Sequence, residues 1–204
     1  MLPLRKDIRY VEADGKLTQA GVEAIQGQID NTNTTLGARL TAVETELAGS
    51  LINLQTAQSA SGTEIDFTGI PSWVNRISVM GRGLSTNGTN NYTLRVGDGG
   101  IVTTGYAGSV TTIAGATPTT GFATVGATVL TGPTAASVFR FEATISRVSG
   151  NAWTITGVGS LSNTNTTTLF AFDIALSGAL DRVRFTTIGG VDTFDAGDIN
   201  ISWE

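Results

Sequence analysis

The sequence predicts a mainly β protein with an N-terminal helical coiled coil, and three observations support this fold class. Apolar residues follow a heptad pattern through residues 22–54. Beyond residue 62 the pattern changes to alternation of apolar and polar residues. Only 14% of the residues are charged and 26 are glycine, a composition typical of an all-β domain with many turns. We expect an antiparallel β-sandwich head of jelly-roll type, with boundaries at 1–19, 20–56 and 57–204.

Two series of apolar residues, each spaced by seven, define the coiled-coil pattern. If they occupy the d and a positions, Gln26 and Asn33 fill the early a positions, where polar residues fix register at a cost in stability. A lone helix gains little from such a stripe, whereas two or three parallel helices bury it. We expect a parallel homotrimer, although the heptads also fit a dimer. The predicted trimerisation residues are Val22, Ile29, Leu36, Leu40, Val43, Leu47 and Leu54.

The helix itself is expected over about residues 17–55, with Thr18 as its N-cap. The poor helix formers of residues 31–35 predict an interruption. The alternative to a coiled coil is a single amphipathic helix that lies on the β domain.

The first 19 residues mix apolar and charged side chains without a clear period. Leu2, Leu4, Ile8 and Tyr10 would be exposed in an isolated segment, so we expect a peptide that docks into another protein. The alternative is a frayed chain end. No apolar run follows the charged residues, which predicts folding in the cytoplasm without a secretory signal or membrane insertion.

Period-two patterns predict nine strands in the head. Glycine-containing pairs such as Asn87-Gly88 and Gly189-Gly190 supply the turns between them, and residues 108–132 are expected to hold loops and short strands. The predicted strands are residues 64–68, 76–82, 92–96, 101–106, 138–148, 153–158, 169–176, 183–188 and 199–203.

The composition excludes several kinds of active site. The chain contains no His and no Cys, which excludes Ser–His–Asp, Cys–His and zinc-type sites. Asp192, Asp195 and Asp198 are spaced by three in a segment that contains glycine, which raises the possibility of a Ca²⁺ loop or a glycosidase pair. Solvated turn carboxylates explain them better, because the spacing lacks an EF-hand pattern. A formal net charge of −5 argues against nucleic-acid binding. We therefore predict no catalytic residue, no metal ligand and no cofactor.

Aromatic side chains provide the binding hypothesis. Tyr92 and Tyr106 flank turns rich in Asn and Gly, so they are expected to be exposed beside Asp98 as receptor-binding residues. The alternative is that these aromatics lie in the core, as most do in β domains. The other aromatic candidates are Trp73, Phe122, Trp153 and Trp203.

Four segments of the head, residues 67–80, 84–89, 100–106 and 192–204, carry a family resemblance. In this order they resemble a module common at the distal ends of bacteriophage tail fibres and related virion proteins. The resemblance implies a virion location, a trimeric β-rich head and a surface glycan or similar receptor on the host. The N-terminal part does not match one recognisable anchor type, so the other virion protein into which we expect it to dock could belong to the tail, the baseplate or the capsid.

Two functions fit this organisation. The first is a non-enzymatic tail fibre that attaches the virion to its host. The second is a structural head fibre or capsid decoration protein without an obligatory receptor role. A polysaccharide-cleaving spike would need a long β-helical repeat, which this sequence lacks.

Overall fold

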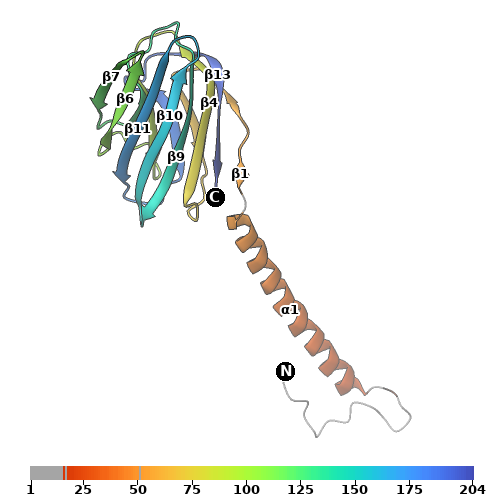
Figure 1. Cartoon of the computed structure of the whole chain (residues 1–204). Coiled ribbons are helices and arrows are strands. Elements are labelled where there is room, and N and C mark those ends of the chain that lie inside the picture. Colours follow the sequence, from red (N-terminus) through yellow and green to blue (C-terminus); the bar gives the residue numbers. More distant parts are fainter. Residues whose placement is uncertain (1–15, 17, 51) are drawn as a thin grey trace. The chain divides into compact units, whose positions relative to one another are not determined.

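The computed structural model describes residues 16, 18–50 and 52–204. The chain divides after Ser50 into an N-terminal unit that contains the helix and a β unit, the head. Within these residues the fold is mainly antiparallel β with one N-terminal helix, as the sequence predicts (Figure 1).

Helix α1 (Gln19–Ser50) is continuous across the predicted interruption. At 1.5 Å per residue it is about 48 Å long. The Thr18 hydroxyl accepts a hydrogen bond from the backbone N–H of Gly21 at 3.0 Å, which confirms the predicted N-cap. The hydroxyls of Thr34 and Thr35 donate to backbone carbonyls four residues earlier, both at 2.9 Å. These bonds let threonine sit inside the helix with its polar group paired.

The helix ends before Leu54, which corrects the predicted stalk boundary and one seam position. Gly49 and Ser50 are poor helix formers at its end. Asn53 and Leu54 instead form strand β1 (Asn53–Leu54), whose backbone pairs with residues 202–203. The described helical seam therefore ends at Leu47, and the head begins with strand pairing at residue 53 rather than at 57.

Two antiparallel sheets build the head. The larger has the order β1-β13-β4-β9-β10-β11-β6-β7 with β2 also on β13, and the smaller has the order β3-β12-β5-β8. The strand bounds are β2 (Gln58–Ser59), β3 (Glu64–Thr68), β4 (Arg76–Thr86), β5 (Tyr92–Gly97), β6 (Ala107–Ala114), β7 (Thr117–Phe122), β8 (Ala127–Leu130), β9 (Phe139–Ser149), β10 (Ala152–Leu161), β11 (Thr166–Ala175), β12 (Arg182–Thr187) and β13 (Phe194–Trp203).

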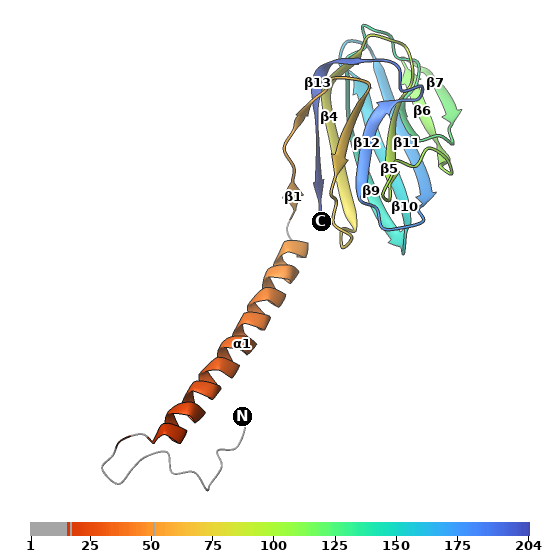
Figure 2. The ribbon, with the colours of Figure 1, turned by 180° about the vertical axis from the view of Figure 1, so that it is seen from behind.

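The two sheets lie face to face, an arrangement consistent with the predicted β-sandwich. Strands β5 and β12 stand behind the larger sheet in Figure 1 and in front of it in Figure 2. Buried residues from both sheets form one hydrophobic core. Strands β9, β10 and β11 form a meander, in which consecutive strands are neighbours. The likeness to a jelly roll therefore applies to the two-sheet packing and not to this part of the connectivity.

Most predicted strands are present, with bounds that differ by a few residues. Strand β3 has the predicted limits, and the segment between residues 108 and 132 contains β7, β8 and all of β6 except Ala107. The predicted strand over residues 101–106 is wrong. Ile101 makes only an isolated bridge to Gly97, and the chain continues through Gly105 with a φ of 83° before β6 begins.

Glycines inside the larger sheet make room for aromatic rings. A Cβ on Gly159 would lie 2.5 Å from Cζ of Phe139, and one on Gly81 would lie 2.6 Å from Cε1 of Phe141. The two rings stack with their centroids 5.5 Å apart, and Phe141 also stacks on Phe185 of the smaller sheet at 5.1 Å. The glycines thus let one aromatic cluster join the two sheets.

Candidate functional site

The predicted helical seam is a stripe of exposed apolar side chains on α1. Spacings of three and four residues place these side chains along one side of a helix. The described members are Val22, Ile29, Leu36, Leu40, Val43 and Leu47, each between 46% and 60% exposed. In the single chain this stripe therefore keeps a large part of its apolar surface in water, where a partner helix could cover it.

The early polar seam position already has a partner within its own helix. Gln26 Nε2 donates a hydrogen bond to Asp30 Oδ1 at 2.8 Å, an exposed contact between residues four apart.

Among the described residues, no helix is both long enough and apolar enough to cross a membrane.

Tyr92 lies in the core, so its predicted role as an exposed receptor-binding residue is wrong. Its side chain has no accessible surface. Its ring packs edge-on against Phe139 and Phe185, both with centroids 5.8 Å away. Tyr92, Leu94 and Val96 alternate along β5, and this period-two pattern is the sequence signal for burial of all three side chains.

Tyr106 is also buried, and the prediction of an exposed side chain is wrong for it too. Its hydroxyl accepts a hydrogen bond from the backbone N–H of Val96 at 2.8 Å and lies 3.2 Å from the carbonyl oxygen of Val102. Burial raises the pKa of Tyr106 to about 12, with the Val96 hydrogen bond and Arg95 acting in the opposite direction. Tyr106 therefore anchors a loop from inside and cannot face a receptor.

Asp98 lies partly exposed in a turn, and its carboxylate makes its hydrogen bonds to residues other than Tyr92 and Tyr106. Its carboxylate accepts hydrogen bonds from the Ser177 hydroxyl at 2.6 Å and from the backbone N–H of Gly178. These bonds, the one from Ser177 first, hold the pKa of Asp98 below its ordinary value although partial burial opposes them. The carboxylate thus joins two loops, and the predicted receptor-binding set of Tyr92, Tyr106 and Asp98 does not form one surface site.

The three aspartates of residues 192–198 do not converge. Asp192 accepts hydrogen bonds from the backbone and side chain of Asn90 at 2.8 and 2.7 Å. Asp195 accepts one from Ser85, and Asp198 forms an ion pair with Arg82 at 3.1 Å. Among the described residues no group of three acidic side chains is placed to hold a metal ion. The interpretation as separately satisfied turn and strand carboxylates fits these contacts.

The remaining aromatic candidates divide between core and surface. Trp153 and Trp203 are buried, whereas Trp73 and Phe122 are exposed. The predicted anchoring residues Leu2, Leu4, Ile8 and Tyr10 lie outside the described residues.

A polar cleft that sequence reasoning missed lies where the β1–β2 segment passes β3. It has a volume of about 310 Å³, and Gln58 Nε2 closes one side by donating to the Asp66 carbonyl oxygen at 2.9 Å. Amide, hydroxyl and indole groups of this kind suit a small hydroxyl-rich ligand. The lining residues are Gln55, Thr56, Gln58, Asp66, Phe67, Thr68 and Trp203.

The residues that line the polar cleft come together only because β1 and β2 both pair with β13, and no local motif signals that pairing.

In comparisons with protein-family models, curated proteins and solved structures, nothing matches this chain.

Proposed function

We propose that this chain is a non-enzymatic bacteriophage fibre protein that attaches the virion to a host surface receptor such as a glycan. Three parallel copies join through α1, and each copy presents a β head. The observation that carries the proposal is the exposed heptad seam of α1. The family resemblance of the head segments supports the virion assignment.

Burial of the seam supplies the driving force for the trimer. Fully burying a Leu or Val side chain stabilises by about 1.5–3 kcal/mol, and each copy contributes six described seam residues to the assembly. Gln26 and Asn33 at early a positions lower this stability and select one register. Parallel packing brings the three N-terminal peptides to the same end of the bundle, as attachment to one virion socket requires.

Weak recognition by each head is sufficient in such an assembly. The polar cleft beside Gln58 and Trp203 is the described feature best suited to a sugar, with an expected affinity on the order of millimolar. Linked heads raise the avidity by about 10²–10⁴ when they engage one surface together. The trimer is then part of the attachment mechanism.

The test is a double substitution in the seam, Leu40→Asp with Leu47→Asp, compared with Ala38→Asp with Thr45→Asp. The control adds the same charge to α1 at positions outside the a and d series. We expect light scattering to show that the seam variant no longer has the mass of a trimer. Virions that carry this variant should attach more weakly to host cells. The control should keep both. An unchanged mass for the seam variant would refute the proposed stalk.

A structural head fibre or capsid decoration protein would share the same trimer but not the attachment role. Cryo-electron microscopy of the intact particle separates the two through the position of residues 1–19. Density for this peptide at the tail tip or baseplate supports attachment to the host, whereas density on the capsid supports the structural role.

A further inference from the structure

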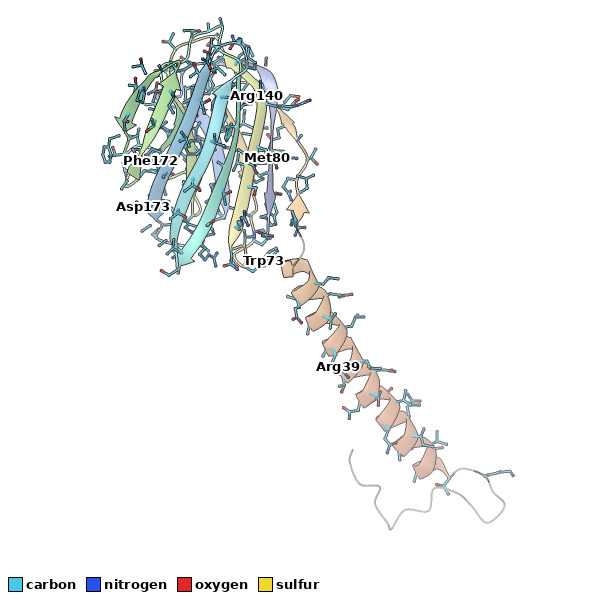
Figure 3. The ribbon with its side chains drawn as sticks, viewed as in Figure 1. Arg39, Trp73, Met80, Arg140, Phe172 and Asp173 are labelled. Atoms are coloured by element: carbon cyan, nitrogen blue, oxygen red, sulfur yellow. The ribbon has the colours of Figure 1, made fainter. Side chains whose placement is uncertain are left out.

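The larger sheet has an outer face with apolar side chains on β4, β10 and β11, and with Glu142 of β9 between them. Met80 on β4 lies opposite Glu142 on β9, which lies opposite Val158 on β10, and Val158 lies opposite Leu169 on β11. Val158 and Leu169 are each about half exposed. These strands stand in front in Figure 1, and Figure 3 labels Met80 on them. We call this surface, together with Leu54, Arg82 and Arg140, the outer face.

Two adjoining hollows shape the outer face. One, of about 540 Å³, lies over β4, β9, β10 and β11 and includes Arg140, Glu142 and Val158 in its lining. The other, of about 300 Å³, lies between Leu54 and Met80 at the β1 edge. Gly81 and Arg82 line both hollows, so the two form one continuous surface.

A row of small side chains lies beside these hollows. Ser78, Thr144, Thr156 and Ala171 lie opposite one another on β4, β9, β10 and β11. Alternation along each strand places them on the same side of the sheet as Met80, Glu142, Val158 and Leu169. Short side chains let a second surface come close to the sheet, so shape does not hinder packing here.

The charges of the outer face complement each other. Arg82 is paired with Asp198, whereas Arg140 and Glu142 have no ion-pair partner among the residues that the structure describes. They stand two residues apart on β9 and point to the same side of the sheet. One unpaired cation beside one unpaired anion is self-complementary, because Arg140 of one copy can meet Glu142 of another.

From these features we infer that the outer face packs against the head of a second copy of this chain. The inference rests on the proposed oligomer, since only two residues separate Ser50 at the end of α1 from Asn53 in β1. Three peptide links then join Ser50 to Asn53, and they span at most about 11 Å. Copies joined through α1 therefore have their β1 strands tethered close together, and Leu54 lies in β1 at the margin of the outer face. The contact buries Leu54, Met80, Val158 and Leu169.

The test uses the absence of cysteine from the whole chain. Val158→Cys places a single thiol on the outer face of the full-length protein, and Val125→Cys places one at another exposed valine, just before β8 of the smaller sheet. Each is reacted with a maleimide, in the otherwise unchanged chain and in the Leu40→Asp, Leu47→Asp background. Leu169→Cys is a second probe of the same face.

We expect the thiol at position 158 to react severalfold more slowly in the assembled protein than in the seam-disrupted protein, and the thiol at 125 to react equally in both. Arg140→Glu and Glu142→Arg should each abolish the protection, and the two together should restore it. A partner of other chemistry would not give this rescue. Loss of protection without rescue would overturn the Arg140–Glu142 pairing.

The outcomes for the outer face and for the stalk can be told apart. Suppose that the seam variant has a lower oligomer mass, and that the thiol at position 158 reacts equally fast with and without the seam substitutions. The outer-face contact is then refuted and the stalk stands. If the seam variant keeps the oligomer mass of the unchanged protein and the thiol at position 158 reacts slowly in both, the outer face associates without the seam. A monomer in every variant refutes both.

Discussion

The hydroxyl of Tyr106 accepts a hydrogen bond from the backbone N–H of Val96 at 2.8 Å, in a part of the head where neither group reaches water. Val96 lies in the smaller sheet and Tyr106 lies at the start of the chain's passage to β6 in the larger one. The bond therefore fixes the loop that links the two sheets, and it is the basis of two predictions.

Tyr106→Phe should lower the free energy of unfolding by about 1–3 kcal/mol, because it leaves the buried N–H of Val96 without an acceptor. Urea denaturation of the full chain measures this. Tyr92→Phe is the matched control, since the Tyr92 hydroxyl has only a 3.3 Å contact with the Thr86 hydroxyl and should contribute less. A larger loss for Tyr92→Phe than for Tyr106→Phe would contradict this ranking.

Alkaline pH should destabilise the head through the same residue. The folded-state pKa of Tyr106 is raised by burial from its ordinary value of 10.0 to about 12, so the folded state holds this proton more tightly than the unfolded state. The stabilisation is complete below about pH 10 and is lost as the pH rises toward 12. Denaturation across this range should show a weaker decline for Tyr106→Phe. An identical decline in both proteins would argue against the buried phenol as its source.

Gly159→Ala should destabilise the head by about 1–3 kcal/mol, because the new methyl group would overlap the ring of Phe139. Gly100→Ala is the control, since a Cβ at Gly100 meets nothing within 4 Å and its φ is not positive. Thermal unfolding measures both. We expect a clear loss only for Gly159→Ala, and equal melting temperatures for the two variants would show that the ring moves aside at no cost.

Asp192→Ala should destabilise by about 1–3 kcal/mol, because it leaves the backbone N–H of Asn90 without its acceptor. Asp195→Ala, at an exposed position, should have a smaller effect. A chelator should leave the melting temperature of the unchanged protein where it was, since the carboxylates of Asp192, Asp195 and Asp198 are engaged by other protein groups. A shift in melting temperature with Ca²⁺ or chelator would revive the metal-loop interpretation.

Local patterns were sufficient to predict the helix, its N-cap and most strands. Alternation in residues 64–68 gives β3 its limits, because one face of that strand is buried and the other is wet. Alternation also accounts for the burial of Tyr92, Leu94 and Val96 on β5. The neighbouring turn residues nevertheless favour an exposed position for Tyr92, which is the source of the wrong prediction. Tyr106 has no such signal, because its burial depends on a loop that turns back to Val96.

Leu54 illustrates what a periodic pattern alone cannot decide. It continues the spacing of Leu40 and Leu47, yet its backbone pairs with Ser202, about 150 residues later in the sequence. Long-range strand pairing overrides local helix periodicity here. The polar cleft and the outer face also depend on strand order, which alternation does not encode.

The pairing of β1 and β2 with β13 has a consequence for the order in which the head can form during synthesis. A ribosome makes residues 53–59 first, but their partner strand exists only after residue 203 has been added and has left the exit tunnel. Until then the larger sheet lacks β13, which lies between β1 and β4. The head must therefore complete its folding late and as a unit, so the proposed association of α1 helices would have time to begin before the head is complete.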